Sequence, residues 1–202
     1  GGVQDADYAI DIATNADAIT MTRAQNALIG TVNDGGDAVI TLSDAGAATG
    51  DADIGKYVLA DGGGTTFTLG ATGQNVDTGN GADIIDVAGL IATGVFNTVN
   101  ADTIKLSTGA NIASVQGEGN AAGAALDADN LTLTANASVT MTAAQNDAFT
   151  GTITASNAGT ETITLSNAVS ATGRANIDAY VLANGAQTFT LGDASQNVTT
   201  GT

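Results

Sequence analysis

An apolar residue standing between two threonines is the pattern that recurs most often along this chain. In a β-strand such a triplet turns its apolar residue inward and both threonines outward, and β-branched threonine suits the pleated surface. Turns rich in Gly, Asn and Asp, such as 61–64 and 184–185, separate the triplets. The pattern predicts an all-β fold of short strands. Its copies are Thr20-Met21-Thr22, Thr66-Phe67-Thr68, Thr132-Leu133-Thr134, Thr140-Met141-Thr142, Thr152-Ile153-Thr154, Thr162-Ile163-Thr164 and Thr188-Phe189-Thr190.

Two segments, 22–29 and 142–149, interrupt the strand pattern and predict one or two helical turns each. Each begins with Thr, and Gln follows three residues later, which is the capping box of a helix N-terminus. Leu28 and Phe149 stand where one face of such a helix turns toward the core. We expect both helical segments to lie at a corner of the β-structure or to cap it.

The chain nearly repeats itself after about 120 residues. Met21 matches Met141 at an offset of 120, and Tyr57 matches Tyr180 at an offset of 123, so small insertions in turns absorb the difference. Repetition on this scale is typical of arrays that build length or surface. Since the chain starts at Gly1 without an initiator Met and stops where a second insert is due, we expect a piece of a longer array or a processed chain. The predicted organisation is a repeat at 1–79, an insert at 80–122 and a truncated second copy of the repeat at 123–202.

Two architectures use short strands at this spacing. In a parallel β-solenoid each strand forms one side of a coil and the coils stack about 4.8 Å apart, whereas a tandem β-sandwich closes a separate core in each repeat of roughly 100 residues. Sandwich cores depend on large buried aromatic residues, and only 3% of this chain is aromatic. Proline, which an interior strand of a stack cannot accommodate, is absent. The sequence therefore favours a parallel β-solenoid-like array, with tandem β-sandwich domains as the alternative.

Acidic residues outnumber basic residues by 21 to 4, which gives a net charge of −17. Four cations leave almost nothing to neutralise phosphates, and an anionic membrane surface repels such a chain. Carboxylates at this density need solvation, salt or bridging cations, and Asp in Gly-rich turns suits Ca²⁺. We expect no nucleic-acid partner and no membrane insertion. The surface is then either simply solvated or carries bound Ca²⁺.

The absence of Cys and His restricts the chemistry further. Without Cys the chain has neither disulfides nor thiolate metal sites, and without His it lacks imidazole zinc sites, the Ser-His-Asp triad and the usual general base. No apolar run approaches the roughly 20 residues that a membrane-spanning helix needs. A composition rich in Asp, Thr, Gly and Ala and free of Cys fits a secreted or cell-surface bacterial protein, so the predicted location is extracellular.

The clearest chemical motif is the nonapeptide Thr78-Gly79-Asn80-Gly81-Ala82-Asp83-Ile84-Ile85-Asp86. Apart from its first residue, it follows the pattern G-G-x-G-x-D-x-U-x of calcium-binding bacterial repeats. Glycines allow the tight turn and direct carbonyl groups at the ion, Asp supplies a carboxylate, and the next apolar residue enters the core. Asp83 is the first metal-ligand candidate, followed by Asp77, Asp86 and Asp102, and Ca²⁺ is the expected cofactor. The alternative is a set of solvated turn carboxylates.

Longer runs in the chain resemble a known group of proteins. The runs TITLS, ATG, YVLA(D/N)G, TFTLG, QNV(D/T)TG and DTIKLSTG look like the repeats of large bacterial surface adhesins and S-layer proteins exported by the type I system, and the nonapeptide is similar to their repeats-in-toxin motif. The resemblance covers most of the chain as a style of repeat. It implies a calcium-stabilised β-solenoid or β-rich stalk at the cell exterior. The single good copy of the nonapeptide departs from the family, in which such copies stack and share ions.

These patterns predict a non-catalytic structural protein that builds a surface layer, an adhesin stalk or a filament by stacking β-coils. Its partners are then further copies of itself, joined head to tail or in a lattice, or other surface components. A second hypothesis is an adhesive or ligand-binding module whose specificity resides in the insert 80–122. That segment differs from the flanking repeats and contains the best calcium motif.

Two other functions are less favoured. Regular Thr-x-Thr arrays can order water and bind ice, but the spacing of the triplets here is uneven. A polysaccharide lyase built on a β-helix needs a cation beside its acidic groups. Arg23, Lys56 and Arg174 do not recur at matched positions of the two repeats, and no pair of carboxylates stands out. We therefore expect that the chain is not an enzyme.

Overall fold

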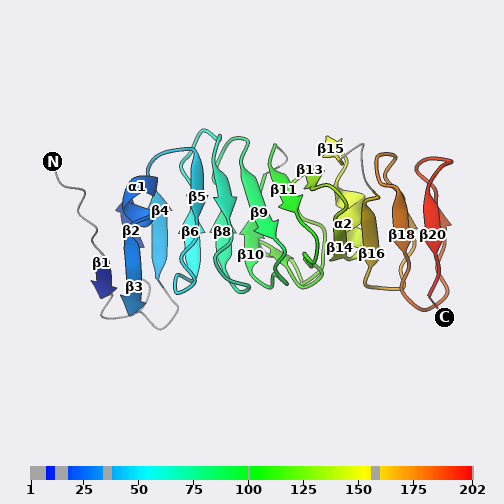
Figure 1. The fold of residues 1–202 in the computed structure, drawn as a ribbon, viewed down its shortest axis with the longest axis horizontal. Helices are drawn as coiled ribbons and strands as arrows, with labels where there is room; N and C mark the ends of the chain where they lie inside the picture. Colours follow the sequence, from blue (N-terminus) through cyan, green and yellow to red (C-terminus); the bar gives the residue numbers. More distant parts are fainter. Residues whose placement is uncertain (1–7, 12–17, 34–37, 100, 156–159, 202) are drawn as a thin grey trace.

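Short strands that lie above one another, coil after coil, form the body of the molecule (Figure 1). The computed structural model describes residues 8–11, 18–33, 38–99, 101–155 and 160–201. These residues form a parallel β-solenoid of about 9 turns with very little helix. Every pairing between the described strands is parallel. The predicted solenoid is therefore confirmed, and the alternative of tandem β-sandwiches is wrong, because sandwiches pair antiparallel sheets.

Strands alternate between two walls of the coil. One six-stranded sheet contains β2 (Ala18–Met21), β4 (Val39–Leu42), β6 (Lys56–Val58), β8 (Asn75–Asp77), β10 (Val95–Asn97) and β12 (Gln116–Gly117). The other six-stranded sheet contains β5 (Ala47–Thr49), β7 (Thr66–Thr68), β9 (Ile84–Ala88), β11 (Thr103–Leu106), β13 (Asn130–Leu133) and β15 (Ile153–Thr154).

Three smaller sheets complete the stack at its two ends. Near the N-terminus, β1 (Tyr8–Asp11) pairs with β3 (Ile29–Asn33). Toward the C-terminus, one sheet contains β14 (Ser138–Met141), β16 (Thr162–Leu165), β18 (Ala179–Val181) and β20 (Asn197–Thr199). The last pair is β17 (Ala171–Thr172) with β19 (Phe189–Thr190).

One coil of the solenoid is much shorter than the sequence repeat. Tyr57, Val76 and Phe96 pair in register on β6, β8 and β10, and they are 19 and then 20 residues apart. Several coils therefore make up each repeat. The strands of the insert 80–122 pair with strands on both sides of it, β10 with β8 and β11 with β13. The insert thus continues the sheets of its neighbours, while the limits of the two repeats stay a prediction.

The central residue of every Thr-x-Thr triplet lies in a strand as predicted, although Thr22 and Thr142 are helix N-caps and Thr142 is buried. In β7 the side chain of Phe67 is fully buried, while Thr66 and Thr68 are partly exposed on the outer surface. The same alternation buries Ile163 in β16 and Leu133 in β13. Inward side chains from the two walls form one continuous apolar cluster along the stack. Burial of this row of mostly aliphatic side chains is the main source of its stability.

Two short helices, α1 (Arg23–Asn26) and α2 (Ala143–Ala148), begin with the predicted capping boxes. Phe149 is buried as expected, but the expectation that Leu28 turns inward is wrong, because its side chain is 43% exposed. Helix α1 ends at Asn26, two residues earlier than its counterpart, so Leu28 already lies beyond the helix. Neither helix is long and apolar enough to cross a membrane, and the described residues contain no other helix.

Each repeat contains the same buried contact between a tyrosine and its short helix. The Tyr57 hydroxyl donates to Asn26 Oδ1 at 3.0 Å, and the Tyr180 hydroxyl donates to Asn146 Oδ1 at 3.1 Å. Each hydroxyl also accepts the backbone N–H of the residue six positions earlier. Each tyrosine ring packs on the phenylalanine of the next strand, with ring centroids 4.6 and 4.8 Å apart. The sequence repeat therefore corresponds to an internal network that links each helix to the second coil after it, α1 to β6 and α2 to β18.

Candidate functional site

The nonapeptide lies at the corner where the chain passes from β8 to β9. Gly79 and Gly81 have φ of +66° and +126°, which glycine adopts without strain. A Cβ atom on Gly81 would lie 2.3 Å from the backbone nitrogen of Gly63, so this turn packs directly on the turn of the preceding coil. The Gly62 N–H also donates to the Asn80 carbonyl at 2.7 Å. The glycines of the motif thus have a structural role, the close stacking of two turns.

Two of the four predicted metal ligands, Asp83 and Asp102, come together just before strands β9 and β11. Asp83 Oδ1 accepts the backbone N–H of Thr65 at 2.7 Å, and Asp102 Oδ1 accepts the backbone N–H of Asp83 at 2.8 Å. The exposed fractions of the two acids are only 1% and 0%. Each carboxylate therefore satisfies a buried N–H of the coil before it, at a corner of the stack.

The second oxygen of each acid has a different environment. Asp102 Oδ2 accepts the Thr78 hydroxyl at 2.6 Å and the Val99 N–H at 2.8 Å. Asp83 Oδ2 is buried and has no hydrogen-bond partner among the described residues. Burial raises the pKa of the Asp83 carboxyl, the nearby charge of Asp102 adds to the rise, and hydrogen bonding from Thr65 opposes it. The charged form of Asp83 is therefore poorly stabilised.

The other two predicted ligands, Asp77 and Asp86, point outward from the two walls and pair with lysines of adjacent coils, although Asp86 is only 9% exposed. Asp86 Oδ2 lies 2.7 Å from Lys105 Nζ, and its Oδ1 accepts the Ala88 N–H at 2.9 Å. Asp77 Oδ2 lies 3.5 Å from Lys56 Nζ on the opposite wall. Ammonium groups and N–H donors thus occupy the oxygens that a cation would need.

Across the described residues, no three acidic side chains are close enough to share a metal ion. Asp83 and Asp102 adjoin each other, but N–H groups and a hydroxyl take three of their four oxygens. Asp77 and Asp86 stand apart on different walls. Calcium binding by these four residues therefore stays a prediction that the geometry does not favour.

A third buried corner acid, Glu161, was not singled out from the sequence. Glu161, which precedes β16, is fully buried, and its Oε1 accepts the Asn136 N–H at 3.1 Å. Its own N–H donates to Asp178 Oδ2 at 3.1 Å, and its Oε2 has no partner among the described residues. The available signal was an acid directly before an alternating strand, as at Asp83 and Asp102.

On the wall formed by β5 to β15, outward threonines do not form the continuous array that ice binding needs. On the wall of β5 to β15, one outward row passes through Thr68, Asp86, Lys105 and Thr132 in register. The ion pair between Asp86 and Lys105 interrupts the threonines in the middle of the wall. An apolar residue, Ile84, interrupts the neighbouring row. The outer surface is therefore chemically mixed.

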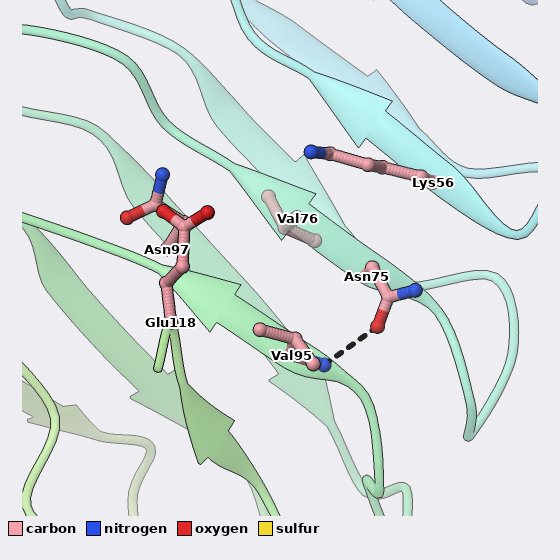
Figure 2. A pocket seen from close by; sticks show the side chains of 6 residues that line it. All are labelled: Lys56, Asn75, Val76, Val95, Asn97 and Glu118. Atoms are coloured by element: carbon pink, nitrogen blue, oxygen red, sulfur yellow. Dashed lines mark hydrogen bonds between the residues drawn. The ribbon is translucent and has the colours of Figure 1, made fainter. Parts of the chain in front are cut away.

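A shallow depression of about 220 Å³ lies on the outer surface of β6 to β12 (Figure 2). Asn75 and Lys56 come from the first repeat, while Val95, Asn97 and Glu118 come from the insert. Asn75 Oδ1 accepts the Val95 N–H at 2.7 Å. In Figure 2 the Lys56 ammonium extends toward the side where Asn97 and Glu118 lie. The depression offers a ligand the ammonium of Lys56, the carboxylate of Glu118 and the amides of Asn75 and Asn97. Among the lining residues, the only ion pair is that of Lys56 with Asp77, which lies beside the depression.

Every basic side chain of the chain is described, and each pairs with an aspartate. The N–O distances range from 2.7 to 3.7 Å in the pairs Arg23–Asp44, Lys56–Asp77, Lys105–Asp86 and Arg174–Asp147. No cation is left over to bind phosphate groups. The surface thus presents a large excess of negative charge with its few cations already neutralised.

Comparison of the chain with protein-family models, with curated proteins and with solved structures finds no match.

Proposed function

We propose that this chain is a non-catalytic structural segment of a protein of the bacterial cell exterior, where stacked β-coils set length and stiffness. The observation that carries the proposal is the pair of six-stranded parallel sheets that run side by side along the stack. Strands lie across the long axis (Figure 1), so the backbone hydrogen bonds between coils lie along it. Each added coil lengthens such a stack by about 4.8 Å, so the number of coils sets its length.

The chemistry of the side chains supports a structural role. Buried acids accept backbone N–H groups at the corners, as Asp102 does from Asp83. The basic residues neutralise aspartates instead of converging on a cleft. The large negative net charge keeps such an elongated surface soluble and opposes lateral sticking. A surface layer, an adhesin stalk and a filament all use these properties.

The location at the cell exterior is tested with antibodies raised against this chain. Intact bacterial cells that produce the protein should be labelled, and mild external protease should release the epitope. Labelling that appears only after the cells are broken would contradict the proposal. As a control, antibodies against a cytoplasmic protein must label broken cells alone.

The depression lined by Lys56 and Glu118 favours a second candidate, a ligand-binding module with its specificity in the insert 80–122. Two amides, a carboxylate and an ammonium beside Val95 suit a neutral or zwitterionic sugar. Screening against a glycan array tests this candidate. Binding should be lost in Glu118→Gln and retained in Glu161→Gln, since Glu161 is buried far along the chain from the depression. Equal binding by both variants, or none by the unchanged chain, would reject it.

A further inference from the structure

The strands β14, β16, β18 and β20, in the C-terminal half of the stack (Figure 1), contain no charged residue, although the net charge of the chain is −17. Two bridges extend their outer surface across the preceding coils, from Thr140 to Asn111 and from Asn111 to Ile91. We call this uncharged surface the neutral face. Its outward residues stand in register, in one row of Ile91, Asn111, Thr140, Thr164, Val181 and Thr199 and a second row of Ser138, Thr162, Ala179 and Asn197.

The two six-stranded walls differ from the neutral face, because each contains an outward ion pair. Lys56 of β6 lies beside Asp77 of β8 on one wall, and Asp86 of β9 lies beside Lys105 of β11 on the other. Acids near the neutral face lie at its margin, as Asp178 does at the corner before β18. A partner that approaches the rows of the neutral face therefore meets no charged side chain there.

The sequence repeat shows that charges are missing from the neutral face as a pair. Strands β18 and β20 are the counterparts of β6 and β8. Ala179 stands where the first repeat has Lys56, and Thr199 stands where it has Asp77. Replacement of one partner alone would have left an unpaired charge, whereas replacement of both leaves an uncharged surface. The two repeats thus share their internal network and differ in the chemistry of this outer surface.

The neutral face is flat and has polar groups to offer. The alternate residues of its strands, such as Val139 and Ile163, point inward and are buried. Its outward side chains are small apart from Ile91, which is 59% exposed. Thr162 and Thr164 are partly exposed, and a hydroxyl group both donates and accepts hydrogen bonds. Small side chains of this kind allow another sheet to approach to about 10 Å, the usual spacing of packed sheets.

The absence of charge decides which partner fits. A polyanion is repelled by the acidic chain and finds no cation on the neutral face, while a polycation is attracted to the acids elsewhere. The neutral face of a second copy is equally flat and uncharged. Contact through any of the charged surfaces would bring carboxylates of two copies together, and contact through the neutral face keeps them apart.

We propose that a second copy of this chain binds the neutral face through its own neutral face, so that two stacks of coils lie side by side. This inference goes beyond the proposed function, because it names the surface that joins two copies and holds wherever the protein resides. Both copies use the same residues, as in an isologous contact. The longer row spans about 24 Å at the spacing of paired strands, which is small for a stable interface, so the dimer is weak.

Salt sets the strength of this contact. Each copy has a net charge of −17, and the acids at the margins of the neutral face repel each other until ions screen them. The fraction of dimer in sedimentation velocity should therefore increase between about 50 mM and about 500 mM NaCl. A decrease over this range would contradict the proposal, because ion pairs and not the neutral face would then hold the dimer.

Crosslinking tests which face joins the copies. The chain contains no Cys, so a single introduced thiol reports on a single position. Thr164→Cys places it near the middle of the neutral face. Thr68→Cys is the matched control, because Thr68 is the last residue of another Thr-x-Thr triplet and lies next to Asp86 on a charged wall. A short bis-maleimide should join copies of Thr164→Cys at least about tenfold faster, since the dimer raises the local concentration of the second thiol. Equal rates would overturn the proposal.

A charge on the neutral face should prevent the contact. Thr164→Asp places two carboxylates near each other in the dimer, so the Kd should rise at least about tenfold, while Thr68→Asp should leave it unchanged. Circular dichroism checks the fold, and if Thr164→Asp does not fold, crosslinking of Thr164→Cys still decides. An unchanged chain that stays monomeric at about 1 mM in about 500 mM NaCl would overturn the proposal. So would a monomer retained on a neutral polysaccharide resin and released by Thr164→Asp, since the face would then bind a glycan.

Discussion

Asp83 and Asp102 are both buried at corners of successive coils, but their carboxylates have different hydrogen-bonding environments. Asp102 accepts three hydrogen bonds with its two oxygens. Asp83 accepts one, keeps one oxygen without a partner, and lies near the charge of Asp102. The same side chain at successive corners thus stabilises the fold in one case and carries an electrostatic cost in the other.

We predict that Asp83→Asn stabilises the protein at neutral pH. Asparagine keeps an oxygen for the Thr65 N–H and removes the poorly solvated charge. Because folding raises the pKa of Asp83, the folded state binds its proton more tightly than the unfolded state. The cost of the charge is therefore absent below the ordinary Asp pKa and is fully present above the raised value. The gain in Tm of the variant should appear as pH increases through this window, as measured by thermal unfolding at several pH values.

Asp102→Asn is the matched control and should have the opposite effect. Its amide NH₂ group would face either the Val99 N–H and the Thr78 hydroxyl or the Asp83 N–H, and a buried donor would lose its acceptor. An unsatisfied buried group costs about 1–3 kcal/mol, so we expect a lower Tm at pH 7. Destabilisation by both variants would show that Asp83 is stabilising when charged, for example through a bound cation.

At the scale of the element, the two helices begin with the same capping box but differ in what surrounds it. Thr22 and Thr142 each accept the N–H of the glutamine three residues later. The Thr142 hydroxyl also donates to the Gly123 carbonyl, which anchors α2 to the preceding coil. We predict that Thr22→Val costs about 1 kcal/mol for the lost cap, and that Thr142→Val costs more because Gly123 also loses its donor. Urea unfolding of the two variants measures the difference, and equal costs would contradict the anchoring role.

The elements that were predictable from sequence are those specified by local patterns. Alternating triplets identify strands such as β7 and β16, and a capping box identifies α2, because neighbouring residues alone determine both. The length of a coil was not predictable. Tyr57 and Val76 stack one coil apart and share only apolar character.

Residues that recur between the two sequence repeats are those that make the same hydrogen bonds, and they do not recur from one coil to the next. Gln74 and Gln196 match because each donates to two backbone carbonyls at a corner and accepts an N–H of the adjoining turn. The hydrogen bonding of Asp83 was not predictable for a related reason. Its partner Thr65 lies 18 residues earlier, and only the register between coils brings the two together. The nonapeptide read along the chain predicts a calcium ligand, and only the register between coils shows that Asp83 also accepts an N–H from the preceding coil.

At the scale of the whole molecule, divalent ions can act on the acidic surface in two ways, by screening the repulsion between carboxylates or by binding between specific carboxylates. We predict that CaCl₂ and MgCl₂ at equal ionic strength raise Tm by the same amount, because no three described acids are positioned to share an ion. Excess chelator with the ionic strength restored by NaCl should leave Tm unchanged. A larger rise in Ca²⁺ that disappears in Asp83→Asn would instead establish the nonapeptide as a calcium site.

The last prediction uses two matched amides to follow the ends of the stack. The flanking N–H groups of Asn75 and Asn197 donate to the preceding coil, at Gly55 and Asp178. In a parallel strand the next N–H points the other way, so the N–H groups of Val76 and Val198 face the following coil. That coil is present beside Val76 as β10, whereas β20 has no strand partner on this side within the described residues.

In dilute, low-salt solution, hydrogen exchange at Val198 should therefore be fast and exchange at Val76 should be slow, since only Val76 has a β-ladder acceptor. Exchange followed by NMR or mass spectrometry measures both amides in one sample. Equal exchange rates at Val76 and Val198 would contradict the prediction, because they would show that the outer side of β20 is already covered.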